Sequence, residues 1–223
     1  MGFFKELQKQ TDLERKALFN VPVISQCLKG QVTKKNYIAF LTEAYHHVKH
    51  TVPLLMACGS RLPEEYEWLR EAVAEYIEEE KGHQEWILND IEACGIDKED
   101  IRRGRPLLAT ELMIAYVYDV INRGNPIGFF GMVQVLEGTS IALATKAAES
   151  IQNALELPDK AFSYLNSHGN LDIKHMEFFE NLMNRITSEK DQEAILNCAK
   201  VIYKLYADIF HTLSAIPGKQ SIA

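Results

Sequence analysis

The chain has 223 residues, of which 47% are hydrophobic and 25% are charged, with 24 basic and 31 acidic residues. These fractions are ordinary for a folded protein and exclude disorder, collagen-like repeats and low complexity. The net charge of −7 disfavours a surface that follows phosphate groups, so we expect no nucleic-acid partner.

Apolar residues recur at three- and four-residue spacing through almost the whole chain, which is the pattern of amphipathic helices. Pro53 predicts a kink in the third of these helices, because proline lacks a backbone N–H. The connections are short, and neither a linker nor a repeat is visible. We therefore predict a single all-α domain, a helical bundle over 1–216, with 217–223 as a frayed tail. The predicted helices cover 3–18, 20–29, 34–60, 63–94, 106–123, 126–154, 158–188 and 190–214.

The cysteines and the N-terminal segment bear on the cellular compartment. No CxxC pair occurs among the four cysteines, which excludes a zinc ribbon or a thioredoxin motif. The first residues lack the apolar core of a signal peptide, and no window approaches about 18 uncharged apolar residues. We expect a cytoplasmic protein with no membrane partner.

Six polar side chains occupy helix positions where the pattern demands apolar residues. Two of them lie three residues apart in the predicted helix 63–94, a spacing that places both on one helix face. One lies in helix 126–154, and three follow one another along the core stripe of helix 158–188. In that order the six are Glu80 and His83, then Glu137, then His168, Asp172 and His175.

A metal centre explains this set, because buried carboxylates cost several kcal/mol unless they are paired or metal-bound. No Lys or Arg falls on these stretches of stripe. Mixed carboxylate and imidazole ligands suit iron or manganese, and carboxylate-rich bundles commonly hold two ions. Taken singly, each motif has a plainer interpretation: a solvated face for Glu80 and His83, a buried acid bonded to a tyrosine for Glu137, and a structural hydrogen-bond cluster for the remaining three. The Gly169-Asn170 pair argues against a continuous helix there, unless metal binding orders the segment.

Two further clusters have open interpretations. His46, His47 and His50 lie on one predicted helix and could chelate a metal, although contacts with neighbours are the commoner role; we keep only His47 as a pocket residue. The basic run at 102–105 either contacts a substrate carboxylate or phosphate or is a solvated loop, and we favour the loop.

Segments 28–50 and 78–95 resemble the TenA/coenzyme-PQQ-synthesis-C group of the heme-oxygenase-like fold, and the resemblance extends over about 15–210 in helix order and spacing. The six polar residues resemble the ligand set of heme-oxygenase-like di-iron oxidases, above all in the pattern H-x3-D-x2-H that ends at His175. Several members of that family take the first carboxylate seven residues before the histidine, where this chain has Tyr76. The first ligand is therefore Glu80, with Glu79 as the alternative.

The resemblance implies an oxidoreductase that binds two iron ions, or iron with manganese, and uses O2 against a small organic substrate with an external electron donor. Tyr76, Glu79, His47 and Tyr45 are then expected in the second shell or the pocket. No heme is expected, since the first histidine is His46. We also allow for a homodimer.

The alternatives are a metal-independent, TenA-like hydrolase of aminopyrimidines and a non-catalytic helical scaffold or regulator. The TenA chemistry requires an aspartate where this chain has Ala44 and a cysteine nucleophile on the helix 126–154. No cysteine lies between 95 and 197, so we assign no catalytic nucleophile.

Overall fold

The computed structural model describes residues 2–215, except for the side chains of 168–174, and the predicted tail at 217–223 lies outside the described residues. Every regular element in the described part is helical, so the all-α prediction is confirmed. The α-helices are α1 Phe3–Gln10, α2 Asp12–Phe19, α3 Pro22–Leu28, α4 Lys34–Val48, α5 Thr51–Arg61, α6 Glu67–Glu80, α7 His83–Ala93, α8 Lys98–Arg103, α9 Leu108–Arg123, α10 Phe130–Leu155, α11 Ser163–Arg185 and α12 Glu189–Ser214. Three 3-10 helices precede α6, α10 and α11, namely η1 Glu64–Tyr66, η2 Pro126–Phe129 and η3 Asp159–Ala161.

Three predicted helices are each divided in two. The first is interrupted at Thr11, the third at 49–50 and the fourth at 81–82. The short helix α8 was not predicted, because Ile101 is the one apolar residue in its sequence KEDIRR and leaves no helical periodicity to detect. Its start is fixed by Asp97, whose side chain accepts a hydrogen bond from the backbone N–H of Glu99.

The kink predicted at Pro53 is instead a break between α4 and α5, a few residues earlier in the chain. Pro53 lies in the first turn of α5, where a missing N–H is tolerated because that donor has no partner within the helix. The chain therefore uses this proline to begin a helix.

The second break lies within the motif singled out in the sequence. Gly82 has a φ of +88°, in the left-handed region, and separates Glu80 at the end of α6 from His83 at the start of α7. The argument that these two residues share a face of one continuous helix is therefore wrong. Glycine is favoured at this position because a side chain in this conformation is strained.

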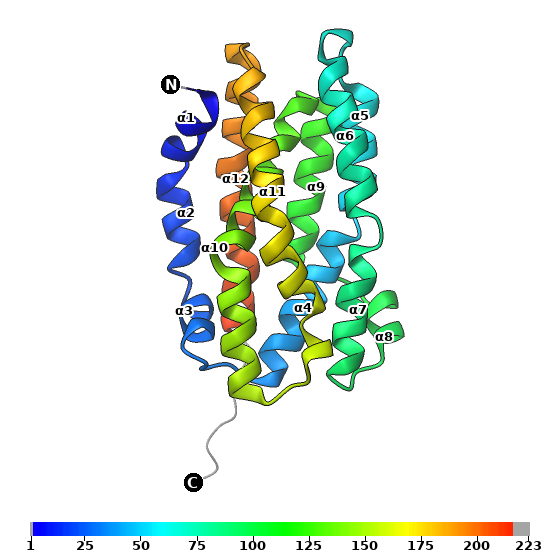
Figure 1. Cartoon of the computed structure of the whole chain (residues 1–223), viewed down its shortest axis with the longest axis vertical. Coiled ribbons are helices and arrows are strands. Elements are labelled where there is room, and N and C mark those ends of the chain that lie inside the picture. The colour runs from blue at the N-terminus through cyan, green and yellow to red at the C-terminus, as the bar shows by residue number, and fades with distance from the viewer. Residues whose placement is uncertain (1, 216–223) are drawn as a thin grey trace.

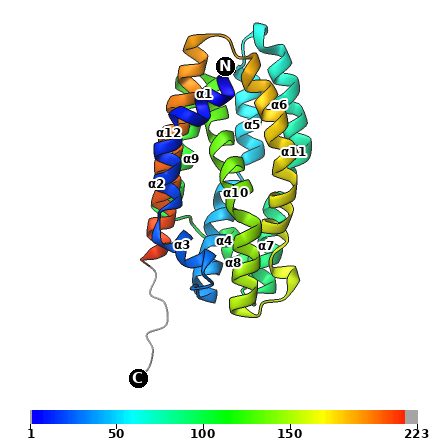
Figure 2. The same cartoon turned by 60° about the vertical axis from the view of Figure 1, so that its left-hand side comes forward.

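The helices run along the long axis of a bundle, with α4 and α5 stacked end to end as one column and α7 and α6 as another (Figure 1). The central helix α10 packs against α11 and α12, while α1 to α3 cover one side (Figure 2). Gly131 permits the close approach of α10 to α12, since a Cβ there would lie 2.5 Å from the carbonyl oxygen of Ile195. Despite Gly169-Asn170, α11 is a continuous helix.

Two groups of buried apolar side chains form the core. The larger joins α1–α3, α5, α6, α9, η2, α12, the start of α10 and the C-terminal half of α11, and the smaller joins α4, α7, η3, the C-terminal half of α10 and the start of α11. The segment Pro126–Leu155 has the length and hydropathy of a membrane span, but 56% of its most apolar window is buried inside the bundle, as in the core helix of a water-soluble protein. The candidate site lies where the two groups of core residues meet.

Candidate metal centre

Four of the six predicted ligands have described side chains, and they come from α6, α7, α10 and α11. Glu80, His83 and His175 are buried, and the Glu137 side chain is only 13% exposed. His168 and Asp172 lie on α11, but their side chains are outside the described residues. Sequences far apart in the chain thus converge on one region of the bundle.

Glu80 and His83 meet across the break at Gly82. The Nδ1 atom of His83 lies 3.0 Å from Oε2 of Glu80, and the His83 ring stacks on Trp86 with 4.1 Å between ring centroids. An ionised carboxylate only accepts hydrogen bonds, so Nδ1–H of His83 is the donor, and the neutral ring then has its lone pair on Nε2. A carboxylate that fixes the tautomer of a histidine in this way is common around metal sites.

His175 contacts two carboxylates. Its Nε2 lies 3.0 Å from Oε2 of Glu79, whereas its Nδ1 faces Oε1 of Glu137 at 3.9 Å. A ring nitrogen and a carboxylate oxygen are both ligand atoms that iron and manganese accept. This pair of side chains therefore fits a metal ion.

The remaining predicted residues differ in their placement. Tyr76 is 2% exposed, lines the cavity described below and directs its ring edge-on to His175, with 6.1 Å between centroids. His47 also lines the cavity, where its ring packs edge-on against Tyr206. Tyr45 does not line it; its ring packs against His46 and beneath the Lys49 ammonium. The pocket role predicted for Tyr45 is not supported by this position.

The histidine cluster at 46–50 is divided between two faces. His47 faces the cavity, whereas His46 and His50 line a separate pocket between α4 and α9. The Lys49 ammonium lies 3.1 Å from Nδ1 of His46, and burial together with Lys49 lowers the pKa of His46 to about 4. A neighbouring ammonium is a poor companion for a metal ion, so these histidines do not extend the candidate centre.

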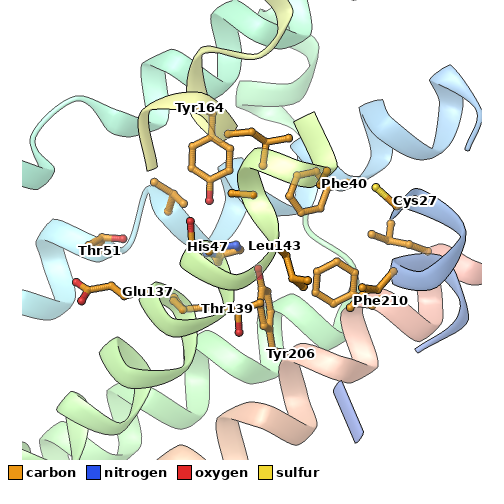
Figure 3. Close-up of a pocket in the computed structure, with 18 of the residues that line it drawn as sticks. Cys27, Phe40, His47, Thr51, Glu137, Thr139, Leu143, Tyr164, Tyr206 and Phe210 are labelled. Carbon is orange, nitrogen blue, oxygen red and sulfur yellow. The ribbon is translucent and has the colours of Figure 1, made fainter. Parts of the chain in front are cut away.

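A cavity of about 180 Å³ begins beside Glu80 and Glu137 and passes between α3, α4, α10 and α12. Figure 3 shows Glu137 and Thr51 at one end, Cys27 and Phe210 at the other, and His47, Thr139 and Tyr206 between them. Most of the lining is aliphatic or aromatic, and its described residues include neither Lys nor Arg. The cavity can therefore hold a small, largely apolar molecule against the carboxylate end.

The donor set fits iron or manganese. Carboxylates and imidazoles are the ligands these ions prefer, and no basic side chain lines the cavity, in its described part, to balance the two carboxylates. Among the side chains that the structure describes, no three His, Cys, Asp or Glu residues form a complete metal-binding group. The described part of the proposed set consists of the two carboxylate–imidazole pairs.

Asp90 is a buried residue of the site region that the sequence analysis did not single out. It is 0% exposed and accepts hydrogen bonds from the backbone N–H groups of Ser163 and Tyr164 at 3.1 and 2.9 Å and from the Ser163 hydroxyl. Burial raises the pKa of this carboxyl group. Asp90 thus attaches the N-terminus of α11 to α7. Its place between Ile87 and Ile91 on the core stripe was the available sequence signal.

The described cysteines are unsuited to nucleophilic catalysis. Burial raises the pKa of Cys27, at the far end of the cavity, to about 11, so its thiol stays protonated at neutral pH. Burial raises the pKa of Cys58 and of Cys198 to about 12. This agrees with the absence of cysteine from α10.

A family model described as "iron-containing redox enzyme" matches residues 38–207. The chain belongs to this family. All six predicted metal ligands fall within the matched residues.

Solved structures agree on the fold of this member of the family. A domain of unknown function with a heme oxygenase-like fold from Shewanella denitrificans OS217 is 28% identical, with a TM-score of 0.84 over 96% of this chain and 92% of that chain. A TenA homolog from Pseudomonas syringae pv. tomato DC3000 has 11% identity and a TM-score of 0.81 over 96% and 93% of the two chains. Heme oxygenase from Leptospira interrogans has 16% identity and a TM-score of 0.75 over 95% and 100%. No curated protein matches.

The predicted superfamily is therefore confirmed, and so is its heme-oxygenase-like, TenA-like fold. The family is one of iron-containing redox enzymes, which supports the prediction of an enzyme. The TenA homolog and the heme oxygenase, at 11% and 16% sequence identity, show only that the fold is shared.

Proposed function

We propose that the protein is a non-heme oxidase or oxygenase that uses two iron ions, or one iron and one manganese, to activate O2 against a small organic substrate. The observation that carries the proposal is the convergence of two carboxylate–imidazole pairs on the end of an apolar cavity that has no basic side chain in its described lining. The family description independently supports iron and redox chemistry.

In this proposal Glu80, His83, Glu137, His168, Asp172 and His175 hold the metal ions. Iron held by these residues would supply the electrons for the reduction of O2, and a reductant from outside the chain would restore them. The approach of the Nδ1 atom of His175 to a Glu137 carboxylate oxygen, at 3.9 Å, supports an ion at this point, because both are ligand atoms for iron or manganese.

The chain's own groups orient the ligands and exclude water. Glu79 fixes the orientation of His175 through its Nε2, and Glu80 does the same for His83 through its Nδ1. The aromatic and aliphatic walls keep water away from the substrate and position it at the Glu80 and Glu137 end. Tyr76 and His47 contact the substrate or the adjoining ligands.

The two alternative functions have less support. A TenA-like hydrolysis has no cysteine nucleophile on α10, and the thiol at the far end of the cavity is protonated at neutral pH. A non-catalytic scaffold gives no reason for a cavity that meets two buried carboxylates.

Metal analysis of protein purified from iron-supplemented cells tests the proposal. We expect about two iron ions, or one iron and one manganese, per chain. His83→Ala should lower this content strongly, whereas His211→Ala, at an exposed position of α12, should retain it.

Less than about 0.2 iron or manganese per chain would contradict the proposal, since a site with this donor set should fill when iron is plentiful. A stoichiometric heme absorption band would contradict the non-heme assignment. Hydrolysis of an aminomethylpyrimidine by metal-free protein would favour the TenA-like function instead.

A further inference from the structure

Among the threonines of the described helices, Thr139 is the one whose hydroxyl is buried without a hydrogen-bond partner in the described part of the chain. The buried Thr110 donates its hydroxyl to Oε2 of Glu43, and Thr42 and Thr212 each donate to the backbone carbonyl four residues earlier, at 2.8 and 2.9 Å. This local bond is the usual way for a threonine on a helix to satisfy its hydroxyl. Thr139 lies in the interior of α10 and is only 5% exposed, yet its Oγ1 has no hydrogen-bond partner among the described residues.

Thr139 also lines the apolar cavity, between the Glu137 end and the Phe210 end (Figure 3). Burying a hydroxyl without a partner costs about 1–3 kcal/mol, so a bound molecule that pairs with it recovers this cost. The position is therefore one where a ligand gains a hydrogen bond that the described residues do not supply.

The rest of the cavity limits what that ligand can be. Phe40 and Phe210 stack at 6.1 Å between ring centroids and form an apolar wall toward the far end. The described lining contains no Lys or Arg that could pair with an anionic group at the position of Thr139. A cation there would lie among aromatic and aliphatic groups, away from Glu80 and Glu137, which the proposed metal ions occupy.

We propose that the substrate is a small, mainly hydrocarbon molecule with one uncharged hydrogen-bonding group, such as a hydroxyl, ether, ketone or amide, and that this group binds the hydroxyl of Thr139. The hydrocarbon part then lies along the wall of Phe40 and Phe210, while the atoms on the other side of the polar group approach Glu137. Thr139 is a residue for specificity and positioning. The assignment of a substrate rests on the proposed function, whereas binding at Thr139 is testable by itself.

The test uses the full-length, iron-loaded protein with two probes of equal length, 1-hexanol and n-hexane, and measures each affinity by NMR titration. The hydroxyl probe should bind wild type about 3- to 10-fold more tightly than Thr139→Val, because one neutral hydrogen bond contributes about 0.5–1.5 kcal/mol. Hexane should bind both proteins equally. Thr139→Ser should restore the hexanol affinity, and Thr42→Val, outside the cavity, should leave it unchanged.

Thermal unfolding of the same variants supplies a second measurement that needs no ligand. Removal of an unpartnered buried hydroxyl should leave Tm unchanged or raise it in Thr139→Val. A fall of several degrees would overturn the proposal, because it would show that the hydroxyl already has a partner. Equal hexanol affinity in wild type and Thr139→Val would also overturn the proposal that Thr139 binds the polar group, whatever the metal content. Failure of the protein to bind iron would contradict the proposed function, but it would not affect the comparison of hexanol affinities.

Discussion

Glu79 and Glu80 are adjacent in the chain but contact different imidazoles. Glu80 is buried and meets His83, whereas the Glu79 side chain is 43% exposed and meets His175. Glu78 is more exposed still, and its carboxylate pairs with the Lys81 ammonium at 2.8 Å. Of these three consecutive residues, Glu80 is a proposed metal ligand, Glu79 orients a proposed ligand, and Glu78 has no contact with the candidate centre among the described interactions.

Alanine substitutions in this run should rank the three residues. Glu80→Ala should lower the iron content most, because it removes a proposed ligand. Glu79→Ala should weaken metal binding by about 10- to 100-fold through the lost orientation of His175. Glu78→Ala should have no effect. Metal analysis after dialysis against a weak chelator measures this, and a loss from Glu79→Ala that equals or exceeds that from Glu80→Ala would refute the assignment of the first ligand.

A second buried carboxylate, Glu43, attaches α9 to α4. It is 4% exposed and accepts hydrogen bonds from the backbone N–H of Leu107 at 3.0 Å and from the Thr110 hydroxyl at 2.5 Å. Burial is the largest influence on this carboxyl group and raises its pKa above the ordinary value of 4.5. The folded state therefore holds this proton to a higher pH than the unfolded state does.

The pH dependence of stability should reveal this group. Between the ordinary and the raised pKa the native state binds more protons, so the contribution of Glu43 to the free energy of unfolding is lost as pH rises through that range. Glu43→Gln does not titrate, so the stability of wild type relative to this variant should decline from pH 4.5 upward. Urea unfolding at several pH values measures the difference. A difference that stays constant with pH would contradict the expectation.

At the scale of helices, the break at Gly82 is the element that brings Glu80 and His83 into contact. Gly82 and Gly95 have nearly the same backbone conformation, with φ of +88° and +82°, and a Cβ at either position would meet nothing within 4 Å. The two glycines flank α7, one at each end. A side chain would be strained to the same extent at either glycine, but only Gly82 lies next to the proposed ligands Glu80 and His83.

Gly82→Ala and Gly95→Ala should each destabilise the protein by about 1–2 kcal/mol, because alanine is strained in the left-handed conformation. Only Gly82→Ala should also reduce iron content, since relief of that strain shifts Glu80 relative to His83. Chemical denaturation and metal analysis on the same samples separate the two effects. Equal iron content in both variants would show that the break has no part in metal binding.

The sequence predicted which stretches are helical better than it predicted where helices end. Apolar periodicity continues across 49–50 and across 81–82, because the stacked helices on either side bury the same side of the bundle. The break at 81–82 depends on one glycine that a helix could also have accommodated at a cost of about 1 kcal/mol. The apolar periodicity therefore predicted the helical segments correctly but did not predict the breaks at 49–50 and 81–82.

The same comparison holds for the candidate site. Glu80, His83, Glu137 and His175 were identified from polar residues on apolar stripes, and the structure brings them to one region. The contact between Glu79 and His175 could not be predicted, since it joins α6 to α11 and no local pattern records the alignment of two helices. The position of Tyr45 could not be predicted for a related reason. The sequence does not show which face of α4 meets the cavity, and Tyr45 is buried on another face.

For the molecule as a whole, the cavity lies at the junction of the two groups of core residues. Leu143 is near its middle, next to Phe210 (Figure 3). Buried apolar cavities in proteins bind small apolar guests such as xenon or benzene. The wild-type protein should therefore bind xenon in a saturable manner.

Leu143→Trp should abolish xenon binding by filling the cavity, at a cost in stability of about 1–3 kcal/mol from overpacking. Iron content should stay unchanged, because the substitution lies away from Glu80 and His175. The matched control is Leu112→Trp, at a side chain that is 49% exposed on α9. Xenon NMR measures the binding, and undiminished binding in Leu143→Trp would show that the guest occupies another place.

The distribution of the proposed ligands along the chain has a consequence for biosynthesis. The carboxylate–imidazole pairs unite α6 and α7 with α10 and α11, so the set is incomplete until the ribosome has produced the segment beyond Ser163. A nascent chain, which folds from its N-terminal end, can close only the Glu80–His83 pair before then. Under the proposed function, the full ligand set therefore becomes available to iron only once α11 has packed against α7 and α10.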